Sequence, residues 1–252
     1  HRPIRIPRLW THVGLARELM AHPPDALFVP AHVLPAAFAW PQMRRRIHAV
    51  VTVHDVGYRH FPSAHPPAQR LYLDLGTRLS VRYAGAVIVD SEATRRDVIR
   101  FYGNGVAPDR IIVAHPGPLS LAEVSEEEAR RTLAKFGLDD GRPYALHVGT
   151  LQPRKNLRRL LLAYRRLLQA RGPAQCPPLA IAGARGWWVD GLLRAAREWG
   201  LAPHVRWLGR VPDAHLPALY SACTAFVYPS LYEGFGLPAL EALACGAPTV
   251  TS

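Results

Sequence analysis

The sequence lacks several features that would place it in a particular class of protein. None of its 252 residues belong to a run of roughly 18 consecutive apolar residues, the length a membrane-spanning helix needs. It has only three cysteines, Cys176, Cys223 and Cys245, with no Cys-x-x-Cys pair, which argues against a disulfide framework. There is no Asp-x-Asp metal motif, and no apolar signal segment follows the first residues. We therefore expect a cytoplasmic protein that is soluble or peripheral to a membrane.

Lysine is also nearly absent, although the chain is strongly basic. It has 31 basic and 19 acidic residues and a net charge of +12, yet Lys135 and Lys155 are its only lysines. This charge favours anionic partners such as phosphates, acidic lipid headgroups or nucleic acid. The arginines are scattered rather than clustered, which is typical of a coding bias. We expect no nucleic-acid partner, and peripheral contact with an anionic membrane stays open.

The chain is rich in apolar, strand-like runs that alternate with helical patterns, which predicts α/β layers with parallel sheets. In the first half, strands are predicted at Ala26–Val29, Ala49–His54, Ala86–Asp90 and Ile111–Ala114, and helices at Pro67–Tyr83 and Glu92–Tyr102. Ser91 is expected to cap the second helix, and Gly103 to close it.

A turn at residues 116–118, a charged helix at 126–136 and a second turn at 139–143 predict a domain boundary. We expect an N-terminal domain over 1–117 and a C-terminal domain over 118–252. Strands of the second domain are predicted at Tyr144–Val148, Leu179–Ala182, Val205–Leu208, Ala225–Tyr228 and Thr249–Thr251. The first helix between them should begin at an Asn156 cap and stop at Gly172. Both domains look truncated: the first begins without an opening strand, and the second ends on one.

Residues 228–241 are the most informative stretch, because a strand runs into a glycine-bearing loop and then a helix with Pro238 in its first turn. Ligands bind at the carboxyl ends of parallel strands, and such a loop can hold anionic or hydroxyl-rich groups. Glu233 in the loop and Glu241, expected in the first helical turn, could grip two parts of one ligand. A solvated loop with a dipole-favoured glutamate explains the same residues equally well.

Residues 229–246 resemble the donor-site signature of glycosyltransferase family 4, Glu-x7-Glu within Pro-Ser-x-x-Glu-Gly-Phe-Gly-Leu-Pro-x-x-Glu-Ala-x-Ala-Cys-Gly. The resemblance implies the GT-B fold, with two Rossmann-like domains facing a central cleft, and a retaining transferase. It implies that Glu233 contacts the transferred sugar and that Glu241 holds the ribose of a nucleotide sugar. The remaining implied binding residues of this loop are Ser230, Gly234, Phe235, Gly236 and Leu237.

A second element, residues 147–156, is another strand running into a helix. Arg154 and Lys155 at the helix start would oppose the helix dipole unless an anion lay between them, so a diphosphate is a natural partner. A solvated pair of bases is the alternative. The run resembles the family's Val-Gly-Thr-Leu-x-Pro-Arg-Lys-Asn block, which adds Gly149 and Thr150 to the site. Many family members carry Arg at the position of Thr150, and Arg154 is expected to replace that cation.

Three weaker elements complete the sequence evidence for the site. His54 follows a strand of the first domain, where a structural pair with a carboxylate is one explanation. The resemblance implies instead that it faces the donor. Ser91 resembles a family Ser-Glu pair that lines the cleft, although a helix cap is preferred. Val211 lies in a loop that the resemblance places beside the nucleotide base.

The resemblance predicts transfer of a hexose, most closely mannose from GDP-mannose, to a sugar or lipid-linked saccharide acceptor in polysaccharide or glycolipid synthesis. Neither a metal nor another cofactor is expected, because Arg154, Lys155 and loop amides would stabilise the leaving diphosphate. UDP-glucose and related donors stay open. The rival hypothesis is a non-catalytic nucleotide-sugar-binding or scaffolding protein with the same fold.

Overall fold

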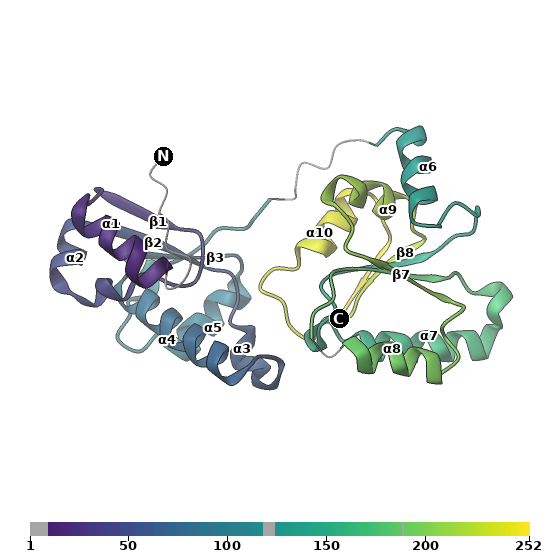
Figure 1. Cartoon of the computed structure of the whole chain (residues 1–252), viewed down its shortest axis with the longest axis horizontal. Helices are drawn as coiled ribbons and strands as arrows, with labels where there is room; N and C mark the ends of the chain where they lie inside the picture. The colour runs from purple at the N-terminus through teal and green to yellow at the C-terminus, as the bar shows by residue number, and fades with distance from the viewer. Residues whose placement is uncertain (1–9, 118–123, 188) are drawn as a thin grey trace. The chain divides into compact units, whose positions relative to one another are not determined.

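The computed structural model describes residues 10–117, 124–187 and 189–252, and the chain divides into two compact units. The first unit comprises residues 1–116 together with 233–235, and the second comprises 117–232 together with 236–252. The division falls between Pro116 and Gly117, next to the predicted boundary, whose Pro118 lies outside the described residues. Figure 1 shows a parallel-stranded sheet with helices packed against it in each unit.

The first unit is built on a four-stranded parallel sheet in the order β1-β2-β3-β4. Its strands are β1 (Ala26–Val29), β2 (His48–Val53), β3 (Ala86–Val89) and β4 (Ile111–Val113). The helical segments are η1 (Trp10–Leu15), α1 (Ala16–Ala21), η2 (Ala36–Ala39), α2 (Pro41–Arg46), α3 (Gly57–His60), η3 (Pro62–Ala64), α4 (Pro67–Tyr83), α5 (Glu92–Tyr102) and η4 (Pro108–Arg110). All four predicted strands are present within one residue at either end, and α4 and α5 have the predicted bounds.

Valines on alternate positions of the two central strands form the core of this unit. Val51 and Val53 of β2 pair in register with Val87 and Val89 of β3, and all four are fully buried. Successive strand residues point to opposite faces, so this alternation puts one row of valines on a single face. The β2–β3 pair therefore positions the residues that follow each strand, His54 after β2 and Asp90 after β3.

The ends of α5 are formed in two different ways. The Ser91 hydroxyl accepts a hydrogen bond from the backbone N–H of Thr94 at 3.1 Å, which confirms the predicted cap. Gly103 does end the helix, but not in the left-handed conformation that a closing glycine usually supplies, because its φ is −72°. A Cβ at this position would collide with the carbonyl oxygen of Ile99, so close backbone packing is what requires glycine here.

The second unit has a five-stranded parallel sheet in the order β7-β6-β5-β8-β9. The strands are β5 (Ala145–Val148), β6 (Leu179–Ala182), β7 (Val205–Gly209), β8 (Ala225–Tyr228) and β9 (Thr249–Thr251). The chain passes from β5 to β6 and β7 on one side, and then returns to β8 and β9 on the other side of β5. The strand order therefore reverses at β5, a feature that the sequence did not predict.

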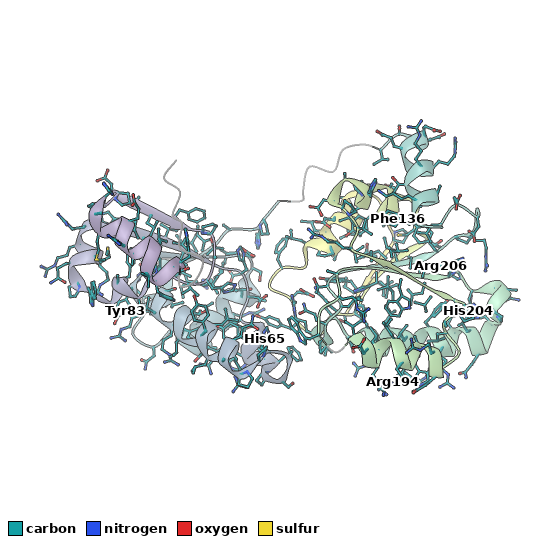
Figure 2. The ribbon with its side chains drawn as sticks, viewed as in Figure 1. His65, Tyr83, Phe136, Arg194, His204 and Arg206 are labelled. Carbon is teal, nitrogen blue, oxygen red and sulfur yellow. The ribbon has the colours of Figure 1, made fainter. Side chains whose placement is uncertain are left out.

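Helices cover both faces of this sheet. They are α6 (Glu126–Lys135), η5 (Pro153–Lys155), α7 (Leu157–Arg171), η6 (Pro173–Gln175), α8 (Val189–Glu198), η7 (Asp213–His215), α9 (Leu216–Ala222) and α10 (Leu237–Ala244). Figure 1 shows α7 and α8 on one face and α6, α9 and α10 on the other, and Figure 2 labels Arg194 on α8 and Phe136 at the end of α6. Leu179 and Ile181 of β6 pack in the cluster with α7 and α8, whereas Ala180 and Ala182 pack in the cluster with α9 and α10. The two faces thus have separate cores.

The helix α7 begins after Asn156 as predicted, but the cap differs from the prediction. Asn156 is in the left-handed conformation with φ 57°, and its side chain makes no capping hydrogen bond. Its backbone carbonyl accepts the first helical bonds instead, from the N–H groups of Arg159 and Leu160. Gly172, with φ 78°, ends the helix where predicted. Within the described residues, no helix is both long enough and apolar enough to cross a membrane.

Candidate functional site

The reversal of strand order in the second unit creates the place where a ligand is expected. Loops that follow β5 and β8 leave these neighbouring strands toward opposite sides of the sheet. In open α/β sheets, ligands bind outside the carboxyl ends of the strands at such a switch point. The loop after β5 leads to Arg154 and Lys155, and the loop after β8 leads to Glu241. The topology therefore puts both predicted donor-site elements of the second unit at one edge of the sheet.

Direct contacts join these two loops. The backbone N–H of Leu231 donates to the carbonyl oxygen of Arg154 at 2.8 Å, and the Arg154 guanidinium donates to the carbonyl oxygen of Tyr232 at 3.0 Å. Arg154 thus holds the loop after β8, a task that the sequence did not predict for it. Its assignment to the diphosphate stays a prediction.

Lys155 lies in a buried environment that is suited to a cation. Only 5% of the residue is exposed, and its ammonium donates to the Tyr228 hydroxyl at 2.6 Å and lies 4.8 Å from the centre of that ring. A buried ammonium is costly unless it is hydrogen-bonded, and an aromatic face adds attraction. The alternative of a solvated surface base is therefore wrong for Lys155. Tyr228 was missed, although it directly precedes the recognised motif.

Glycines at the strand ends allow the neighbouring loops to pack closely. A Cβ on Gly183, just after β6, would collide with the carbonyl of Gly149, just after β5. The N–H of Gly183 donates to the carbonyl of Gly209 at 2.7 Å, which ties in the loop after β7. The predicted site residue Thr150 is exposed in this region, whereas Val211 is buried in the core.

Glu241 lies on α10, one turn further along than predicted. The helix begins at Leu237, and its first turn contains no acidic residue. Glu241 is only 6% exposed, and one carboxylate oxygen, Oε2, accepts a hydrogen bond from the Tyr220 hydroxyl at 2.9 Å. The alternative of a solvated, dipole-stabilised glutamate is therefore wrong. Tyr220 was not predicted, since it lies on a different helix, 21 positions earlier in the sequence.

The loop between β8 and α10 has other features of a binding loop. Gly236 takes the left-handed conformation with φ 93° immediately before α10, and Pro238 lies in the first turn as predicted. The Ser230 hydroxyl is buried and has no hydrogen-bond partner among the described residues. A buried, unsatisfied hydroxyl is uncommon in proteins, and a bound ligand would account for it.

Residues 233–235 group with the first unit, where they lie against the carboxyl ends of its strands. The Gly234 carbonyl accepts hydrogen bonds from the hydroxyls of Ser91 at 2.5 Å and Thr94 at 3.1 Å. A Cβ on Gly234 would collide with the carbonyl oxygen of His54, so only glycine fits here. Phe235 packs on the His115 ring at 5.7 Å between centroids. Ser91 therefore both caps α5 and contacts Gly234 within the first unit.

His54 has both ring nitrogens engaged within the first unit. Nδ1 lies 2.9 Å from the Asp90 carboxylate, and Nε2 lies 3.0 Å from the Pro30 carbonyl. Both partners are acceptors, so the arrangement favours the doubly protonated imidazolium. Burial lowers the pKa of His54, but the hydrogen bonds to Asp90 and Pro30 outweigh it and raise the pKa above its ordinary value. The ring therefore suits a fixed cation better than a general base.

Two further histidines, not predicted, lie next to His54 or to its partner Asp90. The His32 ring is 5.8 Å from the His54 ring, and burial lowers the pKa of His32. His115 hydrogen-bonds the Asp90 carbonyl at 3.0 Å. The signal was available in the sequence, because His32, His54 and His115 follow β1, β2 and β4 within a few residues. No group of three or more potential metal-ligating side chains was found among the described residues.

Two family models together match most of the chain. The model described as "Glycosyl transferase 4-like domain" matches residues 1–117, and the one described as "Glycosyl transferases group 1" matches residues 128–252. The O-antigen chain mannosyltransferase B of Escherichia coli is 38% identical over 206 residues, covering 81% of this chain and 52% of the relative. The serotype-specific mannosyltransferase WbdA of Escherichia coli is 33% identical over 173 residues, covering 67% of this chain and 21% of the relative.

The solved structures agree on the fold. HepE from Anabaena, in complex with UDP and glucose, superposes with a TM-score of 0.70 at 22% identity, covering 94% of this chain and 61% of that one. The chain belongs to the family 4-like glycosyltransferases, with the two Rossmann-like domains of the GT-B fold. It spans about half the length of the O-antigen relative (52%) and about a fifth of WbdA (21%).

Proposed function

We propose that the complete protein is a retaining glycosyltransferase that transfers mannose from GDP-mannose to an acceptor hydroxyl in surface polysaccharide or glycolipid synthesis. The observation that carries the proposal is the switch point at β5 and β8, where Lys155 and Glu241 are both buried and both held by tyrosines. The similarity to mannosyltransferases of O-antigen chains supports the choice of sugar.

In this proposal the second unit binds the nucleoside diphosphate. Lys155 and the loop amides contact the diphosphate, and the unpartnered Ser230 hydroxyl supplies another hydrogen bond. Glu241 holds the ribose, and the loop containing Val211 lies beside the base. By family position, Glu233 and residues 234–237 contact the transferred sugar and its phosphate.

The reaction breaks the bond between the anomeric carbon and the diphosphate oxygen, and forms a bond from that carbon to the acceptor oxygen on the same face of the sugar. Negative charge builds on the leaving diphosphate, where the preorganised ammonium of Lys155 stabilises it. The acceptor proton passes to a donor phosphate oxygen. This route needs no protein base, which is consistent with a His54 ring whose two nitrogens are already hydrogen-bonded.

The donor assignment can be tested by a thermal-shift screen of the complete protein against GDP-mannose, UDP-glucose, their nucleoside diphosphates and a single-stranded DNA. We expect the largest stabilisation from GDP-mannose. A larger shift with UDP-glucose would correct the donor, and stabilisation by DNA alone would overturn the proposal. Transfer of radiolabelled mannose to an endogenous acceptor fraction separates an enzyme from the non-catalytic alternative.

Peripheral contact with an anionic membrane, at the inner face of the plasma membrane, is part of the proposal. Half-exposed apolar side chains lie on η1 and α4, including Trp10, Leu71 and Leu75, with exposed Arg70 and Arg78 on the same helix as the leucines. The two helices are in contact, because His12 hydrogen-bonds the Tyr72 hydroxyl at 3.2 Å. Apolar and basic side chains on one amphipathic surface favour binding to acidic lipid headgroups.

Flotation of the complete protein with vesicles tests this contact. We expect binding to vesicles that contain phosphatidylglycerol and little binding to pure phosphatidylcholine. The double variant Leu71→Ser/Leu75→Ser should not bind these vesicles. Leu167, on α7, is also an exposed leucine, and Leu167→Ser should leave vesicle binding unchanged. Equal binding of both variants would remove this surface from the proposal.

A further inference from the structure

Tyr220 and Glu241 form a buried pair between the helices α9 and α10 of the second unit. Tyr220 is fully buried, Glu241 is 6% exposed, and the phenol oxygen lies 2.9 Å from the carboxylate oxygen Oε2. A phenol donating to an ionised carboxylate makes a charge-assisted hydrogen bond, which is stronger than one between neutral groups. The contact therefore restrains the Glu241 carboxylate before any ligand binds.

Aromatic packing fixes the direction of the Tyr220 ring. It meets the Phe226 ring edge to face, with 5.3 Å between centroids, and Phe226 stacks on Tyr228 at 5.7 Å. Phe226 is itself fully buried on β8. Tyr228 also hydrogen-bonds the ammonium of Lys155. The rings of Tyr220, Phe226 and Tyr228 therefore form a row that runs from the contact with Glu241 to the contact with Lys155.

The Tyr220 hydroxyl is the donor of this hydrogen bond to Glu241. Burial and the neighbouring Glu241 carboxylate raise its pKa well above the ordinary value for tyrosine. The hydroxyl therefore keeps its proton at any working pH and acts as the donor in this pair. A carboxylate has two oxygens, so Oε2 is committed to Tyr220 and Oε1 remains the atom that can turn toward a ligand.

We propose that Tyr220 is a positioning residue of the donor site, which holds Oε2 of Glu241 so that Oε1 accepts hydrogen bonds from the ribose hydroxyls. The inference rests on the proposed function, because it takes the ribose as the ligand of Glu241. It adds that the site discriminates ribonucleotides from deoxyribonucleotides through this tyrosine, which does not itself touch the nucleotide.

Tyr220→Phe tests the proposal, since it removes one hydroxyl and keeps the ring. Tyr144→Phe is the matched control: Tyr144 is another buried tyrosine of the same unit, and its hydroxyl donates to the backbone carbonyl of Leu219 at 2.7 Å. Both variants lose one buried hydrogen bond, but only the first loses a contact with Glu241. The measurement is isothermal titration of the complete protein with GDP and with 2′-deoxy- and 3′-deoxy-GDP, or with the UDP series if the wild type binds UDP.

We expect the wild type and Tyr144→Phe to prefer the ribonucleotide, and Tyr220→Phe to bind it about tenfold more weakly, close to the affinity of one of the deoxy analogues. In transfer assays the donor KM should rise while kcat changes little, because the ribose contact is the same in the ground state and the transition state. A Tyr220→Phe protein with the ribose preference of Tyr144→Phe would overturn the inference.

A second comparison tests whether Tyr220 acts through Glu241. Glu241→Gln alone should already lose the ribose preference, and adding Tyr220→Phe to it should weaken nucleotide binding no further. Additional loss in the double variant would mean that Tyr220 acts by another route, and would contradict the proposal. If the wild type binds no nucleotide at all, the proposed function fails first, so the two failures are distinguishable.

Discussion

The two sheets of this molecule share parallel strands and βαβ connections but differ in strand order. In the first unit the described strands lie side by side in chain order, whereas in the second the order reverses at β5. The difference extends to the functional side chains. Lys155 and Glu241 of the second unit are buried and held by tyrosines, whereas the His54 side chain of the first unit is 49% exposed. The reversal of strand order brings together the loops that follow two neighbouring strands, and each of these loops leads to a buried charged residue.

The largest difference between the two units should appear when the buried cation of the second unit is removed. Lys155→Ala should lower kcat for sugar transfer by about 100-fold or more, because the ammonium stabilises charge on the leaving group. Lys135→Ala, at the only other lysine and exposed on α6, is the control and should leave transfer unchanged. Steady-state kinetics of the complete protein provide the measurement. Equal activity in both variants would remove Lys155 from the site.

Packing of the loops in the second unit can be tested at Gly183. Gly183→Ala should destabilise this unit by about 2 kcal/mol or more, because the added methyl group collides with the backbone of Gly149. Gly191→Ala on α8 has open space around the added methyl group and should stabilise the helix by about 0.5–1 kcal/mol. Urea unfolding monitored by circular dichroism measures both changes. Similar stabilities for the two variants would mean that the backbone of Gly149 does not pack closely against Gly183.

The first unit should show the greater pH sensitivity near neutrality, and two of its histidines, His54 and His32, should act in opposite directions. The pKa of His54 is raised on folding, so its stabilising contribution is complete below pH 6.5 and is lost as the pH rises through the folded pKa. The pKa of His32 is lowered, so its contribution is present above pH 6.5 and is lost as the pH falls through the folded pKa.

Melting temperatures of the wild type, His54→Gln and His32→Gln between pH 5 and 8.5 check this expectation. Relative to the wild type, His54→Gln should lose stability mainly at low pH, and His32→Gln mainly at high pH. The effect of His54 should stay below about 1 kcal/mol, because its ion pair with Asp90 is partly exposed. Parallel pH curves for the wild type and His54→Gln would show that the imidazolium does not contribute.

The regular elements were largely predictable from the sequence because their signals are local. Apolar runs bounded by turn residues predicted the strands of both sheets, and the Ser91 cap depends on a neighbour only three residues away. Failures occurred where a local pattern is short or ambiguous. The segments η1, α1, η2, α2 and α3 were not predicted, since they are too short to show a clear helical period. Asn156 begins its helix through its backbone rather than its side chain.

The candidate site was predictable as a set of residues, but the state of each residue was not. The loop from Ser230 to Glu241 was recognised from its motif, and the structure keeps its turn and its Pro238 helix start. The sequence did not decide whether the side chains of Lys155 and Glu241 are solvated or buried. The structure decides in favour of burial, through partners that lie 73 and 21 positions away in the sequence. The role of His54 toward a ligand stays a prediction, and the structure adds that both of its ring nitrogens are hydrogen-bonded within its own unit.

The sequence by itself determined the α/β class, the positions of the strands and the segments that are predicted to carry the chemistry, because spacing and turn residues act over a few positions. Only the tertiary structure decided that the chain turns back at β5, that Tyr228 and Tyr220 hold the two charged groups, and that both nitrogens of His54 are engaged. The physical reason is that these features depend on where the chain returns. The partners of a buried charged group are brought to it by contacts between residues far apart in the sequence. The local periodicity of the sequence does not indicate those contacts.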